Sequence, residues 1–152
     1  MLKRSKRWTR TELIELLDTV WLKYPQRLRR LSKDEQVRFA QQQGYARPQD
    51  LLAHLGAWME ETFRVMPYLR RAEKPPRIYR NDSVFNVHAV QRLADRSRAE
   101  VEAWYEEQCA TLKQLIAQLS DEDFRQPRVY RWLSGTIVGH YDEHSLPEKG
   151  SK

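Results

Sequence analysis

The chain has 152 residues, of which 40% are hydrophobic and 32% are charged, and its formal net charge is +6. A chain of this length buries roughly two-thirds of its unfolded surface, which is enough for one hydrophobic core. Its five Trp and seven Tyr argue against disorder. The absence of an apolar run of ~18 residues argues against a membrane span. The lone Cys109 excludes an internal disulfide and a cysteine-rich zinc module. The start of the chain also lacks the apolar stretch of a signal peptide. We therefore expect one cytoplasmic globular domain.

Two stretches of the chain are strongly basic, and such clusters can attract phosphates. The first contains Lys3, Arg4, Lys6, Arg7 and Arg10, and the second contains Arg64, Arg70, Arg71, Lys74, Arg77 and Arg80. Neither stretch lies in a helix-turn-helix, zinc-finger or aromatic-platform context. A basic tail and solvated helix ends therefore explain them better, and nucleic-acid binding is not expected.

The first predicted helix begins after Thr9, because Thr9 and Glu12 have the spacing of a capping box. Apolar residues then recur every three or four positions, at Leu13, Leu16, Leu17, Val20, Trp21, Tyr24, Leu28 and Leu31. Pro25 interrupts this pattern and predicts a kink or a break. Residues 33 to 43 favour a short polar helix that ends before Gly44.

The second predicted helix runs from Pro48 to about Pro67, with Pro48 at its first position and Asp50 in its first turn. One face carries Leu51, Leu55, Trp58, Thr62 and Val65. His54 belongs to that face because it comes three residues after Leu51 and four before Trp58, so its side chain should point inward. Residues 70 to 83 contain two adjacent prolines and no apolar periodicity, which is typical of a long crossover connection.

The second half of the chain predicts a short helix at residues 84 to 94 and a long helix that begins after a capping box at Ser97 and Glu100. The long helix has an apolar seam formed by Val101, Trp104, Tyr105, Gln108, Cys109, Leu112, Ile116 and Leu119. The segment from Asp121 to Phe124 follows this helix and is expected to stop at Pro127. The last helix should span about residues 134 to 145. These elements predict an all-α four-helix bundle with a long crossover, spanning residues 9–146 between a basic tail (residues 1–8) and a polar tail (residues 147–152).

His140 and His144 form an H-x-x-x-H pair in the last helix. On a helix their side chains leave the same face, with Cβ atoms about 5–6 Å apart, so both rings can reach one metal ion. With His54 from the second helix, three neutral imidazoles would suit zinc, nickel or another divalent ion and leave positions free for water. Two histidines at this spacing also occur by chance on solvated faces, and the spacing alone leaves both interpretations open.

Several short segments resemble one known family. These are Asp50-Leu51-Leu52-Ala53-His54-Leu55-Gly56-Ala57-Trp58, Val84-Phe85-Asn86, Leu119-Ser120-Asp121-Glu122-Asp123-Phe124, Tyr130-Arg131-Trp132 and Gly139-His140-Tyr141-Asp142-Glu143-His144. In this order they resemble the DinB-like (YfiT-like) superfamily of four-helix bundle proteins, and more narrowly its ClbS/DfsB branch. The chain departs from the family at Arg47-Pro48, where a Trp-Ser pair is common, and at Ser145-Leu146-Pro147, where a basic, glycine-containing stretch often follows.

The resemblance implies a metal triad, with one histidine from the second helix and an H-x-x-x-H pair from the last. The matching residues are His54, His140 and His144. Known activities in the superfamily include thiol-dependent S-transfer and hydrolytic detoxification of reactive small molecules. Trp58, Asn86, Tyr141 and Trp132 are candidates for residues that line a pocket, although aromatic residues at helical spacing are more often part of a core.

Two functions are compatible with these features. The first is a metal-dependent enzyme that acts on a small electrophilic molecule by hydrolysis or thiol transfer, with catalytic residues that the sequence does not assign. The second is a metal-free protein of the ClbS/DfsB type that binds or sequesters a small molecule. His88 is expected at the surface and Cys109 in inert packing. The oligomeric state stays open, a homodimer included.

Overall fold

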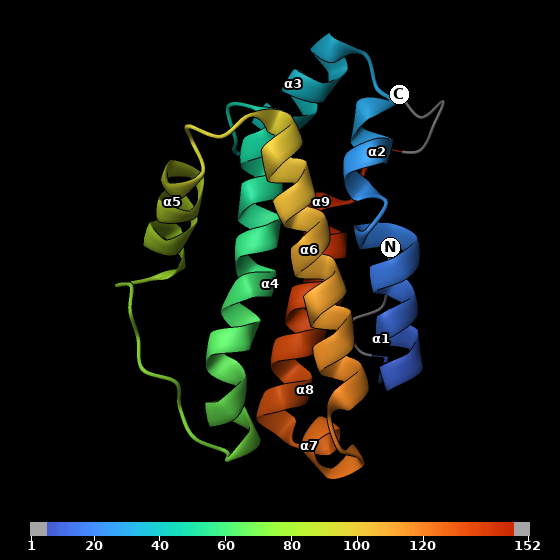
Figure 1. The fold of residues 1–152 in the computed structure, drawn as a ribbon, viewed down its shortest axis with the longest axis vertical. Helices are drawn as coiled ribbons and strands as arrows, with labels where there is room; N and C mark the ends of the chain where they lie inside the picture. The colour runs from blue at the N-terminus through green and yellow to red at the C-terminus, as the bar shows by residue number, and fades with distance from the viewer. Residues whose placement is uncertain (1–5, 148–152) are drawn as a thin grey trace.

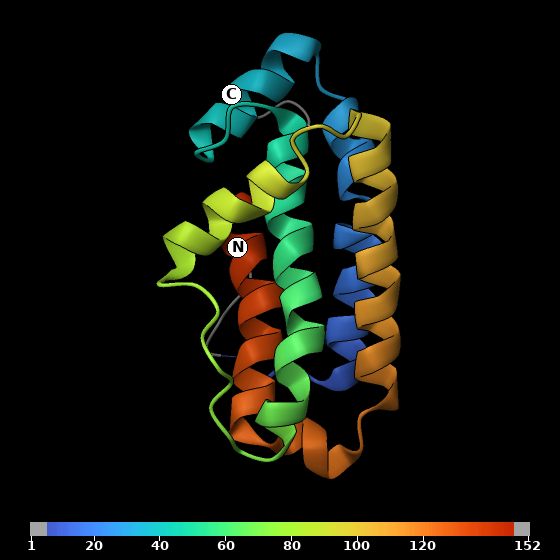
Figure 2. The same cartoon turned by 60° about the vertical axis from the view of Figure 1, so that its left-hand side comes forward.

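The computed structural model describes residues 6–147, and every regular element in this part of the chain is helical (Figure 1). The four legs of a bundle are α1 (Arg10–Leu16) with η1 (Leu17–Trp21) and α2 (Tyr24–Arg29), then α4 (Pro48–Arg70), α6 (Arg98–Gln118), and α8 (Pro127–Ser134) with η2 (Gly135–Gly139) and α9 (His140–His144). The shorter α3 (Lys33–Gln42), α5 (Asp82–Arg92) and α7 (Asp121–Arg125) lie between these legs in the chain. The predicted all-α bundle is confirmed, and the crossover runs between α4 and α5 along the outside of the molecule (Figure 2).

The predicted helix starts follow from their caps. Thr9, Ser32 and Ser97 each accept a hydrogen bond from a backbone N–H three residues on, and the glutamate carboxylate at that position accepts one from the backbone N–H of the cap residue. The chain breaks between η1 and α2 as expected from Pro25, which lies in the first turn of α2. Trp8 is buried beneath α8, with its backbone N–H 2.7 Å from the Tyr130 hydroxyl, so the chain joins the core before the first cap. Most of both predicted tails, residues 1–5 and 148–152, lies outside the described residues.

Two prolines act differently from the sequence-based expectation. Helix α4 continues through Pro67 to Arg70, because the proline ring faces the exposed side while Met66 and Leu69 stay buried in the core. Pro127 begins a helix where a stop was expected, since a proline at the first helical position gives up an N–H that has no intrahelical partner there. The last leg of the bundle is therefore longer than the sequence suggested and runs from Pro127 to His144.

Two π-helical segments, η1 and η2, face each other inside the bundle. The wider turn of η1 is closed by a hydrogen bond of 2.8 Å from the Leu22 N–H to the Leu17 carbonyl. The Trp21 indole N–H of η1 donates to the Ile137 carbonyl of η2 at 2.9 Å. A π-turn adds one residue to the helical repeat and so rotates everything after it. Since η2 directly precedes His140, this turn sets the direction in which His140 and His144 point.

The core fills the space between the four legs. Helices α4 and α6 pack along each other, and Leu51, Leu55, Tyr105, Leu112 and Ile116 are fully buried between the legs. Cys109 lies in this seam as predicted, with only 2% of its surface exposed and its Sγ 3.5 Å from the Met59 Sδ. Burial raises the pKa of its thiol to about 12, which makes it a poor nucleophile. Residues 6–147 contain no helix with the length and apolar character that a membrane span requires.

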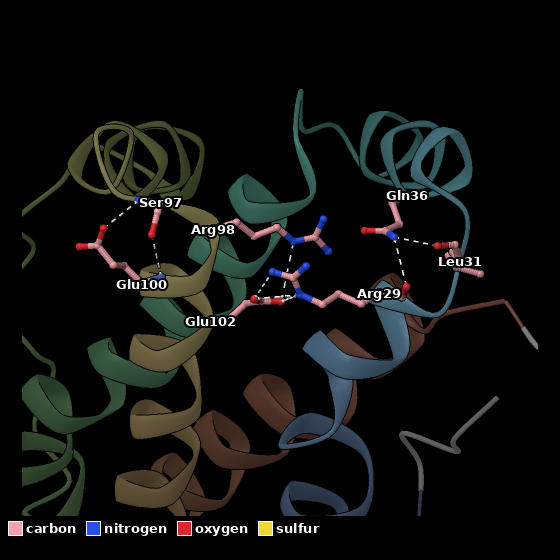
Figure 3. Close-up of polar contacts among 7 residues, drawn as sticks. All are labelled: Arg29, Leu31, Gln36, Ser97, Arg98, Glu100 and Glu102. Atoms are coloured by element: carbon pink, nitrogen blue, oxygen red, sulfur yellow. Dashed lines mark hydrogen bonds and ion pairs between the residues drawn. The ribbon is translucent and has the colours of Figure 1, made fainter.

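A polar cluster fixes the end of the bundle where α2, α3 and the start of α6 meet (Figure 3). The Arg29 guanidinium donates to both carboxylate oxygens of Glu102 on α6 at 2.6 to 3.0 Å. The buried Gln36 of α3 donates its amide N–H groups to the carbonyls of Arg29 and Leu31 in the connection. These contacts hold α3 across the end of the bundle and so determine where its last residues lie.

Gly56 lets α4 approach α6 closely, two residues after His54. A Cβ atom at this position would lie 2.4 and 2.7 Å from the Cζ3 and Cη2 atoms of Trp104 on α6. Trp104, which was expected in the apolar seam, is only half-buried because its indole lies across this glycine. The close approach keeps the helix that carries His54 tight against its neighbour.

Gly56→Ala should lower the free energy of unfolding by about 1–3 kcal/mol, because the Trp104 ring must move to admit the methyl group. Gly135→Ala is the matched control, since nothing lies within 4 Å of the added Cβ there. The control should stabilise the protein by about 0.5–1 kcal/mol, because alanine loses less backbone entropy in a helix. Urea denaturation measures both values, and an equal effect of the two substitutions would contradict the close approach.

Candidate functional site

The fold brings together the three histidines that the sequence suggests as ligands. His54 comes from the second turn of α4, and His140 and His144 come from α9. The ring centre of His54 lies 5.3 Å from that of His140 and 5.0 Å from that of His144, and the centres of His140 and His144 are 5.9 Å apart. His54 and His144 are buried, with 5% and 7% of their surface exposed, and His140 is half-buried. The three rings thus form one cluster at the boundary of the core.

Asn86 and Trp58 fix the protonation of the His54 ring. The Trp58 indole N–H donates to the Asn86 Oδ1 at 2.8 Å, and the His54 Nδ1 lies 3.1 Å from the same oxygen. An indole nitrogen can only donate, so the Asn86 amide must present its oxygen on this side. The His54 Nδ1 must then carry the hydrogen and donate it. The Nε2 atom of His54 is consequently left with a bare lone pair.

Gln43 determines the corresponding state of His144. The His144 Nδ1 lies 2.8 Å from the Gln43 Oε1, and the His144 Nε2 lies 3.2 Å from the Nε2 of His54. With the Gln43 oxygen toward the ring, the His144 Nδ1 carries the hydrogen and donates it, so the His144 Nε2 has no hydrogen. The lone pairs of the His54 and His144 Nε2 atoms then face each other and repel unless a cation lies between them. With the amide reversed, the His144 Nε2–H donates to His54 in an ordinary hydrogen bond.

The surroundings keep these rings uncharged at neutral pH. The pKa of His54 is lowered from its ordinary 6.5 to about 3, chiefly by burial and also by the positive charges that His140 and His144 can carry, while the hydrogen bond to Asn86 opposes the change. Burial also lowers the pKa of His144, and the nearby Glu143 carboxylate opposes this change. Neutral imidazoles are the form that binds metal ions.

The inner nitrogens of His54 and His144 have the separation that a bound cation requires. Two nitrogens held at about 2.0–2.1 Å by one tetrahedral ion are about 3.3 Å apart, and the ring centres of such ligands are about 5 Å apart. For His54 and His144, the 3.2 Å between the Nε2 atoms and the 5.0 Å between the ring centres agree with these values, whereas the ring centre of His140 is 5.9 Å from that of His144. As the side chains of residues 6–147 stand, they contain no complete group of three or more His, Cys, Asp or Glu placed to hold a metal ion. His54 and His144 therefore fit as a preset pair, and His140 lies beside them.

The other predicted site residues divide between two places. Trp58 and Asn86 contact the histidine cluster, whereas Tyr141 lines a different cavity and does not face the three rings. His88 lies at the surface, where its Nδ1 is 3.0 Å from the Tyr79 hydroxyl. Glu143 is mostly exposed, with its carboxylate 3.7 Å from the His144 Nε2.

Gln43 and Tyr45 belong to the site although no motif in the sequence marks them as site residues. The Tyr45 ring stacks on His54 with centres 5.0 Å apart, and Gln43 contacts His144. Both flank Gly44, whose φ of +95° ends α3 and turns the chain toward α4. Their only signal is this glycine after a polar helix, which predicts a turn but no contact with a residue about a hundred positions away.

A cavity of about 230 Å³ beneath the crossover lies next to the cluster. Aromatic residues line it, among them Trp58, Tyr79, Phe85 and Trp132, together with the cations Lys74 and Arg77. Trp58 forms the partition between this cavity and the histidines, since its ring lies 6.1 Å from Trp132 and 6.4 Å from His140. A second cavity of about 620 Å³ is larger, but none of the three histidines lines it.

The comparison with protein families agrees with this architecture. A family model described as DinB superfamily matches residues 16–145, which include all three histidines and the crossover. The chain belongs to the DinB superfamily. The comparisons with curated proteins and with solved structures gave no match. The narrower resemblance to the ClbS/DfsB branch therefore stays a prediction for this DinB superfamily protein.

The lowered pKa of His54 predicts how the stability of this DinB superfamily protein depends on pH. Below about pH 6.5 the unfolded chain binds a proton on His54, whereas the folded protein does so only near pH 3. The free energy of unfolding should therefore fall as the pH drops through this window, by up to about 1.4 kcal/mol per pH unit for this one group.

Urea denaturation of chelator-treated protein from pH 7 to pH 4 measures this dependence. The slope should flatten in His54→Gln and stay unchanged in His88→Gln, because His88 is exposed. Parallel slopes in all three proteins would show that His54 is not a buried neutral group.

Proposed function

We propose that this protein is a metal-dependent enzyme that acts on a small electrophilic molecule by hydrolysis or thiol transfer. The observation that supports it best is the 3.2 Å contact between the Nε2 atoms of His54 and His144. Each ring has its Nδ1 next to an amide oxygen, of Asn86 and of Gln43 respectively. Such partners of the outer nitrogen are typical of metal-binding histidines, because they orient the ring and leave the inner nitrogen free to bind.

In this proposal His54, His140 and His144 hold the cation, with zinc and nickel as the best candidates for an all-imidazole donor set. The bound ion supplies Lewis-acid activation of a nucleophile or of the substrate. The protein contributes the rest: Asn86 and Gln43 hold the rings in place, and the buried surroundings keep His54 uncharged. We expect the substrate in the cavity beneath the crossover, and the Trp58 side chain, which separates this cavity from the histidines, must turn aside for the substrate to reach the ion.

A metal-free protein that binds or sequesters a small molecule is the second candidate. It is favoured by the alternative orientation of the Gln43 amide, in which the His144 Nε2–H donates to His54 and the cluster is held by its own hydrogen bonds. The two candidates differ in what His54→Ala does. In the metal-free protein ligand binding survives this substitution, whereas the enzyme loses its metal and its activity.

Metal content decides between the two candidates. Protein purified without a polyhistidine tag, refolded with zinc or nickel and dialysed, should retain about one equivalent of divalent metal. His54→Ala and His144→Ala should each lose most of it, because each removes a ligand of the preset pair. His88→Ala is the matched control and should retain the full amount, since this exposed histidine on α5 is outside the cluster.

Mass spectrometry of the metal in each sample gives the stoichiometry. Less than about 0.1 equivalent in the unsubstituted protein would contradict the metal-dependent function. Equal losses in His54→Ala and His88→Ala would show that the metal is held elsewhere.

Asn86 offers a test that does not touch a ligand. Asn86→Leu removes the oxygen that accepts from His54, so metal affinity should weaken by about 10–100-fold. Asn86→Asp keeps an acceptor for both His54 and Trp58 and should largely restore the affinity. Competition with a chromophoric chelator measures the three dissociation constants, and equal affinities would show that Asn86 has no role in orienting His54.

A further inference from the structure

The larger cavity lies apart from the histidine cluster but shares helix α9 with it. Its volume is about 620 Å³, which is within the usual range for small-molecule sites of about 300–1,000 Å³. Residues of η1, of α2 and the turn after it, of α9 and of the segment after α9 line it. On α9 the lining residue is Tyr141, whose neighbours His140 and the histidine cluster face α4 instead. The cavity is thus separate from the proposed metal and substrate sites.

Two buried aromatic rings form the base of this cavity. Trp21 and Tyr24 are almost completely buried, their ring centres are 5.4 Å apart, and both are held rigidly. The Trp21 N–H donates to the Ile137 carbonyl at 2.9 Å, and the Tyr24 hydroxyl donates to the His144 carbonyl at 2.6 Å. Because only 1% and 2% of these two residues is exposed, the apolar surface that a ligand can reach belongs to the half-buried Val20, Leu31, Tyr141 and Leu146. Such a wall of aliphatic side chains with one aromatic ring favours a flat, apolar ligand.

The charged residues of the cavity are all cations. Arg27 and Arg30 line it, and no acidic residue does so among the described residues. Neither arginine forms an ion pair in the part of the chain that the structure describes, whereas Arg29 between them pairs with Glu102 on another face (Figure 3). The Tyr141 hydroxyl likewise has no hydrogen-bond partner among residues 6–147. Two unpaired guanidinium groups beside a phenol form a suitable set of donors for an acidic group.

We propose that this cavity binds a planar organic anion, namely an aromatic carboxylate or sulfonate. The ring of the ligand packs against Tyr141 and the aliphatic side chains of Val20 and Leu146, and its acidic group binds Arg27 and Arg30. This site does not depend on a metal, because none of the three histidines contributes to its lining. Its failure or success is therefore independent of the proposed function.

Fluorescence titration with 8-anilinonaphthalene-1-sulfonate tests the site, because this probe combines a naphthalene ring with a sulfonate. The full-length protein is used with a chelator present, at low salt. Arg27→Gln/Arg30→Gln should weaken the binding by about tenfold or more, through loss of charge-assisted hydrogen bonds. Arg125→Gln/Arg128→Gln is the matched control, because it changes the net charge equally at the α7–α8 end of the bundle. It should weaken the binding of the probe less than about twofold.

Two further measurements separate the cavity from general attraction of the probe. Ser145→Trp places a large side chain in the cavity, so it should abolish binding while thermal unfolding monitored by circular dichroism stays unchanged. The neutral probe N-phenyl-1-naphthylamine lacks the sulfonate and should bind the unsubstituted protein and the Arg27→Gln/Arg30→Gln variant equally. Equal weakening in both arginine double variants, or full binding by a folded Ser145→Trp protein, would overturn the proposal.

Discussion

The hydrogen-bond chain from Trp58 through Asn86 to His54 is the constraint on which the site depends. An indole can only donate, so it orients the Asn86 amide, and the amide oxygen then places the hydrogen of His54 on Nδ1. The Nε2 of His54 is thereby turned, without a hydrogen, toward the Nε2 of His144 at 3.2 Å. A contact of this kind in the interior needs a cation or a proton between the two nitrogens. The chemistry of the site follows from that requirement.

The bundle is built to hold this arrangement in place. Gly56 allows α4 to lie directly against Trp104 of α6, while the π-turn η2 sets the direction of α9 and receives the Trp21 indole at the Ile137 carbonyl. The Tyr24 hydroxyl binds the His144 carbonyl at the end of the same helix. Burial keeps His54 uncharged, which makes it a neutral ligand at neutral pH. The same burial lowers the free energy of unfolding in acid, because the unfolded chain binds a proton there that the folded protein does not. Stability and proposed function are thus linked through one side chain.

Sequence periodicity was sufficient for the bundle and for the inward direction of His54, because apolar residues at helical spacing fix the buried face of α4. The pairing of His140 with His144 followed from their spacing. The resemblance to the DinB superfamily, which the family model confirms, came from several short segments along the chain. Other features depended on tertiary structure. Proline ends many helices, but Pro127 begins α8, and the sequence alone does not distinguish the two cases. A π-turn such as η2 cannot be recognised from the spacing of apolar residues. Gln43 reaches His144 only because Gly44 turns the chain, and the partner lies on the last helix.

The central claim is that His54, His140 and His144 bind one cation through ring nitrogens. X-ray absorption spectroscopy of the untagged protein loaded with one equivalent of zinc tests this most directly, because it reports the type, number and distance of the ligands. The account predicts three imidazole nitrogens at about 2.0–2.1 Å, with the remaining positions taken by oxygen. A spectrum with one imidazole or none, or with sulfur from Cys109, would contradict it.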